Sequence, residues 1–491
     1  MPSSFSDGRD GRPGDVTVLF HVTLMTMLRH FEGVILALAE RGHRVRVALP
    51  NRRPDLQPPP ALVEHAAISF VTAPAHRGDE WAHPIHEMRT LRDYLRYLDG
   101  RYDEAPKLRT RALRKMVAAV SREHQSHLAA HCPHCNERLI DDQVGRIMLA
   151  FRKEGRRNLA SMFSLMEATI PSDSAIEAFL RNERPDVVLV TPLINFGSYQ
   201  ADYVKSARAL GIPVGFPVFS WDNLSNKGMI HVIPDRVFVW NSRQRIEAVK
   251  MHRVPVDHVV ITGAPRFDDF FAMTPQQTRG EFCAASGLNP KQPIVAYLCS
   301  SEFVSTHEID FVNRWVGELR ADRDLRECGI LIRPHPREQK PWRKFTPPPG
   351  VAVAFPRALN ADQTLFDTVF HSAAVVGLNT SAELEAGIVG RPVFTVLAGE
   401  HAEGQQGTIH FQYLLKERGG FVEVAPDFET HRRQLAAAVR GEYDADAIRT
   451  FIERFLRPHG WSQPATPVLV SAIEEFARSA GVLRRQDVYQ A

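Results

Sequence analysis

The chain has 491 residues, of which 44% are hydrophobic and 24% are charged, with a formal net charge of +3. A single core rarely grows beyond about 250–300 residues, so this length predicts two domains. The small net charge argues against nucleic acid as a main partner, and the absence of about 18 consecutive apolar residues argues against a transmembrane helix.

Residues 1–15 are polar and glycine-rich and have no apolar stretch of the kind found in a signal peptide. We expect a disordered tail there and a cytoplasmic protein. Five cysteines is an odd and sparse number, which fits a reducing compartment without disulfides.

A βαβ unit opens the ordered chain. DVTVLFHV at 15–22 is typical of a buried strand, LRHFEGVILALAERGH at 28–43 has apolar residues at helical spacing, and VRVALP at 45–50 predicts a second strand. Gly42 stands where a helix would end. Strand, helix and strand within about 35 residues indicate a parallel sheet.

Long, charged segments with helical periodicity follow from about 84 to 181 and predict a helical insertion. The βα alternation then resumes, with strands expected at PDVVLVT, IPVGFPV, DRVFVWN and HVVITG and helices at 198–210 and 242–252. We therefore assign 16–270 to an N-terminal domain and expect the crossing between domains near 267–290.

The second half repeats the pattern, with strands expected at PIVAYLCS, ILIRPHP, VAVAF, AAVVGL and RPVFTVL. This predicts a second parallel-sheet domain over 285–460. Residues 461–491 contain one more helix, which can pack back on the N-terminal domain. The expected fold is therefore α/β, with two Rossmann-like parallel-sheet domains that face a cleft.

Ligands of open parallel sheets bind outside the carboxyl ends of the strands, so the polar loops after strands are candidate sites. The first is RPHP at 333–336. The Arg333 guanidinium suits a phosphate, and His335 can donate a hydrogen bond to an oxyanion or a base edge. A rigid surface turn is the alternative.

The second loop leads into a helix at 377–393. Asn379, Thr380 and Ser381 can cap the start of this helix, where free N–H groups favour an anion. Glu383 and Glu385 lie in the first turns, and a carboxylate there could bind two ribose hydroxyls. The alternative is capping alone.

The third loop is FSWDNLSNKG at 219–228 in the N-terminal domain. Asp222 could be a general base and Lys227 could bind an anionic group, with Trp221 and Asn223 on the same acceptor side. The alternative is a structural loop with Trp221 buried and Asp222 and Asn223 capping turns.

Three further segments follow expected strands. GEHAEGQQGTIHF at 399–411 is a candidate flexible cover for the donor and contributes Thr408. CSSEF at 299–303 could place Ser300 and Ser301 at a phosphate. Arg29 and His30 follow the opening strand and face the cleft in this scheme.

Other motifs are weaker or missing. His131–Cys135 contains a CxxC, but no second ligand pair with zinc-site spacing is found, so no metal is assigned. The sequence has no GxxxxGK[ST] and no GxSxG. The basic stretch at 107–115 is typical of a solvated helix face, with contact to anionic lipid as the alternative.

These motifs resemble GT-B glycosyltransferases over most of the chain outside the helical insertion. The segments that show the resemblance are FEGVILALAERGHRV, ITGAPRFD, RPHP and NTSAELEAGIVGRPV. The last is similar to a helix of non-hydrolysing UDP-N-acetylglucosamine 2-epimerases, which puts Glu385 at the ribose-binding position. His335 and Pro336 are similar to a pair in sialyl- and Kdo-transferases and in CDP-glycerol glycerophosphotransferases.

The resemblance implies a metal-independent glycosyltransferase without a bound cofactor. It would move a sugar from a nucleotide donor to a saccharide, lipid-linked or other hydroxyl acceptor, in bacterial surface polysaccharide or glycoconjugate synthesis. Contact with the inner face of the membrane is compatible with this function. The alternatives are a sugar-nucleotide 2-epimerase, a CDP-glycerol-type phosphotransferase and a non-catalytic nucleotide-sugar-binding protein.

Overall fold

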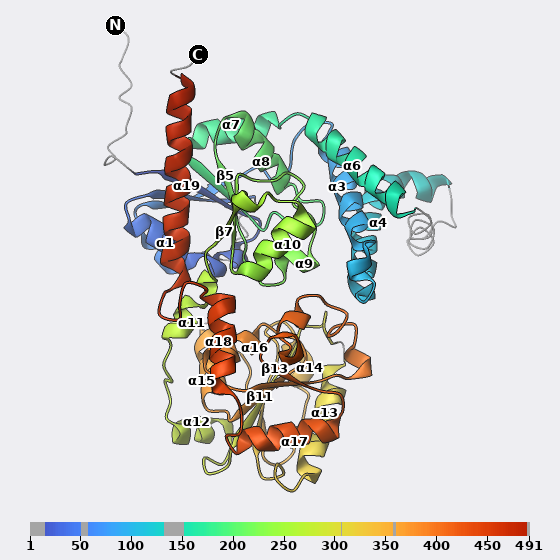
Figure 1. The fold of residues 1–491 in the computed structure, drawn as a ribbon, viewed down its shortest axis with the longest axis vertical. Coiled ribbons are helices and arrows are strands. Elements are labelled where there is room, and N and C mark those ends of the chain that lie inside the picture. The colour runs from blue at the N-terminus through green and yellow to red at the C-terminus, as the bar shows by residue number, and fades with distance from the viewer. Residues whose placement is uncertain (1–14, 51–56, 132–151, 306, 357–359, 489–491) are drawn as a thin grey trace.

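The computed structural model describes residues 15–50, 57–131, 152–305, 307–356 and 360–488, the side chains of 120–131 and 480–488 excepted. The described chain forms two lobes, one above the other in Figure 1, and each lobe contains one parallel sheet with helices on both faces. This confirms the expected α/β fold with two Rossmann-like sheets and a helical insertion in the first lobe.

The first sheet has seven strands in the order β3-β2-β1-β4-β5-β6-β7, and every pairing is parallel. Side chains alternate between its two faces, so Val18 and Phe20 enter one core while Leu19 enters the other. The strands are β1 Thr17–Val22, β2 Arg44–Leu49, β3 Ile68–Thr72, β4 Val187–Thr191, β5 Val214–Pro217, β6 Arg236–Val239 and β7 Val259–Ile261.

Helices cover both faces of this sheet. One face packs on α1 (Glu32–Glu40) and on the last helix, α19 (Ala465–Val488), and the other on α7 (Ser174–Glu183) and α8 (Gln200–Ala209). The first lobe also contains η1 (Met25–His30), α2 (Pro60–Glu64), α9 (Asn223–Asn226), α10 (Ser242–His252), η3 (Val256–His258) and η4 (Pro265–Phe267).

The helical insertion extends along one side of the first lobe (Figure 1). It contains α3 (Ala82–Tyr97), η2 (Gly100–Tyr102), α4 (Pro106–His131) and α6 (Lys153–Thr169). Its own apolar cluster is centred on Tyr97, Tyr102 and Leu108. Phe303 and Ile409 of the second lobe pack against the same cluster, so the insertion also contacts the second lobe.

The second sheet has six parallel strands in the order β10-β9-β8-β11-β12-β13. Its strands are β8 Ile294–Leu298, β9 Gly329–Arg333, β10 Val351–Val353, β11 Ala374–Gly377, β12 Val393–Val396 and β13 Val422–Ala425. Helices α15 (Ala361–Phe370), α16 (Ala382–Ile388) and α18 (Ala445–Leu456) cover one face, and α13 (Glu308–Ala321) and α17 (Phe428–Val439) cover the other.

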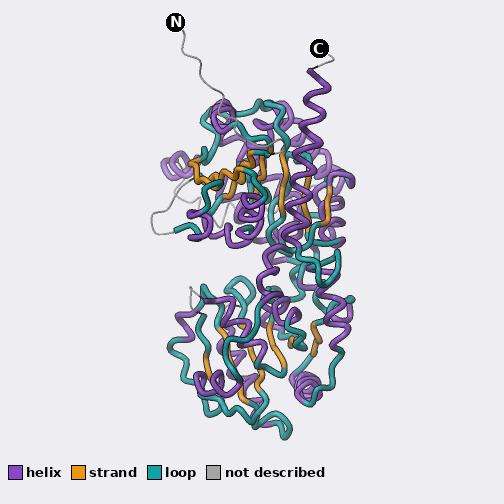
Figure 2. Tube along the Cα trace, turned by 90° about the vertical axis from the view of Figure 1, so that its left-hand side faces the viewer, coloured by secondary structure: helices purple, strands orange, loops and turns teal. Residues whose placement is uncertain are grey.

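The chain passes between the lobes twice. It enters the second lobe at α11 (Asp268–Ala272), whose Phe270 packs on Phe366 of α15, and continues into α12 (Arg279–Ser286), whose Phe282 packs on the second sheet. The chain returns to the first lobe between α18 and α19. Figure 2 shows the two lobes joined on one side of the molecule. The remaining short helices are α14 (Gln339–Trp342), η6 (Gly399–His401), η7 (Phe411–Tyr413) and η8 (Lys416–Arg418). Within the described residues, every helix is too short or too polar to cross a membrane.

Candidate functional site

The two sheets bring most of the predicted site residues to the edges that face each other. In each sheet the strand order reverses beside the first strand, between β1 and β4 in one and between β8 and β11 in the other. Such reversals open a crevice at the carboxyl ends of the strands, where nucleotides bind in doubly wound folds. Arg29 and His30 follow β1, while Ser300 and Asn379 follow β8 and β11.

Arg29 is an available cation at this edge. It lies on η1 with an exposed side chain, and it has no hydrogen bond or ion pair with the other described residues. Partial burial lowers the pKa of Arg29, and the charge of Arg266 lowers it further. The carboxylates of Asp362 and Glu385 in the second lobe raise it. Arg29 therefore lies close to charges of both lobes, as a binding cleft requires.

His30 is half-buried beside it and is neutral. Burial lowers its pKa to about 3, and the charges of Arg266 and Arg29 act in the same direction. Its ring packs against Phe219, and Nδ1 has no hydrogen-bond partner among the described residues. His30 can therefore serve as a neutral hydrogen-bonding group but not as a cation for a phosphate.

An ion pair joins the two lobes. Arg266, just after β7, donates through Nη2 to Oε1 of Glu385 on α16 at 3.0 Å. Burial raises the pKa of Glu385, while Arg266 opposes this shift. Sequence reasoning placed Glu385 here but did not single out Arg266, although ITGAPRFD contains it.

Arg333 is partly committed to the protein. Its Nη2 donates to the Ala361 carbonyl at 2.8 Å and to Thr364 Oγ1 at 3.0 Å, which holds the start of α15. Burial lowers its pKa to about 10, so it remains a cation at neutral pH.

His335 is half-buried and its Nδ1 accepts from the Arg337 amide at 3.3 Å. Burial lowers its pKa, and the charge of Arg337 acts in the same direction. The neutral ring therefore carries its proton on Nε2, where it can donate to a ligand oxygen.

The loop at 399–411 differs from the expected flexible cover. Gln405 is fully buried and donates to Thr395 Oγ1 and to the Val396 carbonyl, both at 3.0 Å. Asn379 Nδ2 donates to the Gly404 carbonyl at 2.7 Å and to Thr408 Oγ1 at 3.2 Å. Because Asn379 and Thr408 are buried and bonded to each other, we assign them a supporting role behind the cleft instead of donor contact.

The polar side chains at the start of α16 differ in their exposure to solvent. Ser381 is exposed at the N-cap position without a side-chain bond to the helix, while Thr380 Oγ1 accepts from the Ala382 amide at 3.4 Å. Glu383 is fully buried over Gly377, where a Cβ would lie 2.7 Å from Glu383 Oε1. Burial raises the Glu383 pKa to about 8. Of this group, Ser381 is the side chain that remains available to a ligand.

The loop after β8 is also mostly committed. The Ser300 amide donates to both oxygens of Glu308, at 3.0 and 2.9 Å, and burial raises the Glu308 pKa to about 8. Ser300 Oγ is buried without a partner among the described residues, and Ser301 is half-buried. A ligand phosphate would therefore reach Ser301 more easily than Ser300.

Asp222 lies on the first-lobe side in a half-buried position. Its Oδ1 accepts from Ser220 Oγ at 2.7 Å, and Oδ2 has no hydrogen-bond partner within the described chain. Burial alone would raise its pKa, but the charge of Lys227 and the hydrogen bond from Ser220 hold the pKa below the usual value. Asp222 is therefore a carboxylate at neutral pH, able to accept a hydroxyl proton but weakly basic.

The helical insertion fixes the backbone of this loop. Arg96 donates to the Leu224 carbonyl and to the carbonyls of Lys227 and Gly228, at 3.2 and 2.9 Å for the last two. Tyr97 Oη donates to the Lys227 carbonyl at 2.7 Å. Sequence reasoning missed Arg96 and Tyr97, because contacts across about 130 positions leave no local pattern.

Trp221 and Asn223 are structural. Trp221 is buried and meets the His410 ring of the second lobe edge-on at 4.6 Å, and Asn226 Nδ2 lies 2.7 Å from His410 Nδ1. Asn223 Oδ1 accepts from the Ser220 amide at 3.1 Å. The loop alternative therefore holds for these two side chains, while Asp222 and Lys227 keep exposed surface.

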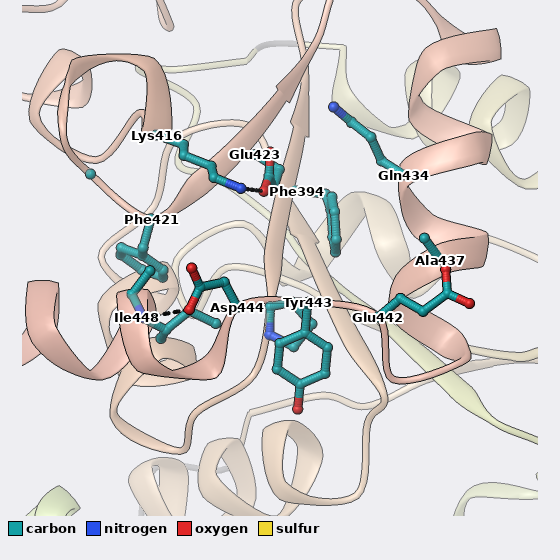
Figure 3. Close-up of a pocket in the computed structure, with 13 residues that line it drawn as sticks. Phe394, Lys416, Phe421, Glu423, Gln434, Ala437, Glu442, Tyr443, Asp444 and Ile448 are labelled. Atoms are coloured by element: carbon teal, nitrogen blue, oxygen red, sulfur yellow. Dashed lines mark hydrogen bonds and ion pairs between the residues drawn. The ribbon is translucent and has the colours of Figure 1, made fainter.

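Away from the cleft, the second lobe has a pocket of about 240 Å³. Figure 3 shows Lys416 paired with Glu423 and a mixed wall that includes Phe394 and Tyr443. Asp444 caps α18 through the Ala447 amide at 2.8 Å. These polar groups bind one another, so the pocket offers little to a charged ligand.

No group of three or more His, Cys, Asp or Glu side chains is placed to hold a metal ion in the described part of the chain. The pair Cys132 and Cys135 lies outside the described residues. Cys283, Cys299 and Cys328 are buried thiols.

Comparison with solved structures agrees with this architecture. The chain is similar to a putative UDP-N-acetylglucosamine 2-epimerase from Listeria monocytogenes, with TM-score 0.50 and 10% identity over 94% of this chain and 97% of the other. A glycosyltransferase from Rickettsia africae gives TM-score 0.49 and 10% identity over 95% and 98% of the two chains. No family model and no curated protein matches. At these identities the likeness shows the fold alone, which is GT-B-like, with two lobes that each contain one parallel sheet.

Proposed function

We propose that the protein binds a nucleotide-activated sugar in the cleft and transfers the sugar to a hydroxyl acceptor. The observation that carries this proposal is the group of cations contributed by both lobes at the carboxyl ends of two parallel sheets. Arg29 and Arg266 come from the first lobe and Arg333 from the second. Three cations beside the carboxylates Glu385 and Asp362 suit a ligand with a diphosphate and a ribose.

In this proposal the residues divide by lobe. Arg29, Arg266 and Arg333 stabilise the negative charge of the leaving phosphate, with His335 and Ser381 as neutral donors. Glu385 binds the ribose hydroxyls once the nucleotide displaces part of its pair with Arg266. Asp222 receives the acceptor proton and Lys227 binds an anionic part of the acceptor.

The chemistry needs no metal in this scheme, because fixed positive charges stabilise the leaving group. A membrane-linked acceptor, a role in polysaccharide synthesis and a cytoplasmic location all remain part of the proposal.

Thermal-shift measurements with UDP, CMP, CDP, GDP and dTDP test the binding step. A ligand at 100 times its Kd stabilises a protein by about 2.7 kcal/mol, so one nucleotide should raise Tm by several degrees. Arg29→Gln should remove most of the shift, because it deletes an exposed cleft cation without removing a hydrogen bond within the protein. Arg101→Gln, on the exposed η2 turn, should keep the shift.

Absence of a shift with all five nucleotides would contradict the proposal. The nucleotide that binds then selects the sugar donor for an activity assay. If the sugar of the donor is epimerised when no acceptor is present, the epimerase alternative is favoured over sugar transfer.

A further inference from the structure

A second pocket lies outside the cleft, on the first lobe. Its volume is about 420 Å³, and it is enclosed by α3, α6, the segment 229–233 and the end of α10. Arg92, Arg208 and Arg253 line it together with His231, His252 and His258. Among the described residues that line it there is no carboxylate. A pocket with three guanidinium groups and no lining acid is suited to an anion.

Arg92 is the strongest evidence for an absent ligand. Its side chain on α3 is buried, with 7% of the residue exposed. Nη2 donates to Ser164 Oγ at 3.1 Å, but Nη1 has no hydrogen-bond partner among the described residues. An unpartnered buried guanidinium N–H is costly, and a bound anion would satisfy it.

The nearby acids are already engaged. Asp93 accepts from the amides of Gly197 at 2.8 Å and Met229 at 2.6 Å, and it lies 3.1 Å from His231 Nε2. Glu167 binds Arg89 through both oxygens. Burial lowers the pKa of Arg92. The charges of Glu167 and Asp93 raise it, and those of Arg89 and Arg253 lower it. The positive charge of Arg92 is therefore not cancelled by a dedicated partner.

Two further arginines extend the charge toward solvent. Arg253 follows α10 in the left-handed conformation, with φ 61°, and its exposed side chain has no ion pair with the described residues. Arg208 donates to the Ile233 carbonyl at 2.7 Å and lies 3.8 Å from Asp235, a weak pair. The pocket thus combines a buried cation with exposed cations at its mouth, an arrangement that both attracts and fixes an anion.

We infer that this pocket is a second anion site, which binds a phosphate group on a small molecule. Phosphate presents several acceptor oxygens to the guanidinium groups of Arg92 and Arg253. Apolar walls from Ile230 and Ile233 leave room for an organic body attached to the phosphate. The site is independent of the nucleotide proposed for the cleft.

The pocket also adjoins the acceptor loop. Met229 and Gly228 directly follow Lys227, and Gly228 is required there because a Cβ would lie 2.8 Å from Asp93 Oδ2. A ligand that contacts Arg92 therefore lies beside the helix that also holds the loop through Arg96.

Thermal-shift titration with inorganic phosphate against sodium chloride of equal ionic strength tests this site. The titration uses an Arg29→Gln chain, so that the cleft contributes little. We expect phosphate to raise Tm, and we expect Arg92→Gln to weaken the apparent affinity about tenfold or more, since a charge-assisted bond is lost. Arg253→Asn should weaken it by a smaller factor.

Arg184→Asn is the matched control. Arg184 ends α7 in the same left-handed conformation, with φ 45°, and it is exposed and not among the residues that line the pocket. Equal phosphate shifts in the Arg92, Arg253 and Arg184 variants would overturn the inference, as would the absence of any shift beyond the chloride control. The inference would be supported if the Arg184 variant keeps the phosphate-induced rise in Tm while the Arg92 and Arg253 variants show a weaker one.

Discussion

Replacing Asp222 by asparagine is expected to lower the rate of sugar transfer by about 10²–10⁴-fold, the usual contribution of a positioned general base. Asparagine keeps the shape and the oxygen that accepts from Ser220 Oγ at 2.7 Å. It removes the negative charge that Lys227 stabilises and that receives the proton of the acceptor hydroxyl. The expected loss is therefore in kcat, with nucleotide binding and Tm nearly unchanged.

The assay measures nucleotide release from the donor chosen by the thermal-shift panel, in the presence of hydroxyl acceptors. Asp235→Asn is the control, because Asp235 accepts from the Val214 amide at 2.9 Å on the same lobe and takes no part in the proposed chemistry. A rate for Asp222→Asn within a few-fold of wild type would remove Asp222 from the mechanism.

Loss of the buried Arg89 charge should destabilise the first lobe by about 3–5 kcal/mol. Arg89 binds Glu167 of α6 at 2.8 and 2.9 Å and Asp202 of α8 at 2.8 and 2.9 Å, and it donates to the Ser198 carbonyl at 3.1 Å. Arg89→Met would leave two buried carboxylates with fewer partners. Because this cluster anchors the helical insertion to the sheet, the insertion should loosen as well.

Urea unfolding followed by circular dichroism measures this effect. Arg101→Ala is the control, since Arg101 pairs with Asp99 in solvent and such pairs contribute less than about 1 kcal/mol. The double variant Arg89→Met, Glu167→Met should recover part of the loss, because it removes one unpaired acid. A loss below about 1 kcal/mol for Arg89→Met would show that the cluster does not anchor the insertion.

The parallel sheets could be predicted from the sequence because their strands are continuous apolar runs. PDVVLVT and PIVAYLCS became β4 and β8, and the helix predicted at 242–252 is α10. Two strands were missed, β3 (ISFVT) and β13 (VEVA). Both are edge strands, and their part-polar sequences lack the continuous apolar signal of the inner strands.

The site was harder to predict because its contacts join distant positions. The sequence indicated Arg333 and Glu385 through their place after strands, and both lie at the cleft. It could not show that Glu385 pairs with Arg266, 119 residues away. It also could not show that Asn379 and Thr408 bind each other instead of facing a ligand.

The same limit applies to the loop at 219–228. Its polar composition suggested a ligand site, whereas half of its side chains hold the loop itself or meet His410 of the second lobe. Composition indicates which groups are present, but only the fold decides whether their partners are protein or ligand.

The structure of the protein with the nucleotide that raises its Tm most would test the central claim directly. We predict that the phosphates lie beside Arg29 and the loops that follow β8, β9 and β11, with the ribose within hydrogen-bond distance of the Glu385 carboxylate. A nucleotide bound outside the cleft, or one that contacts neither Arg29 nor Glu385, would contradict the account.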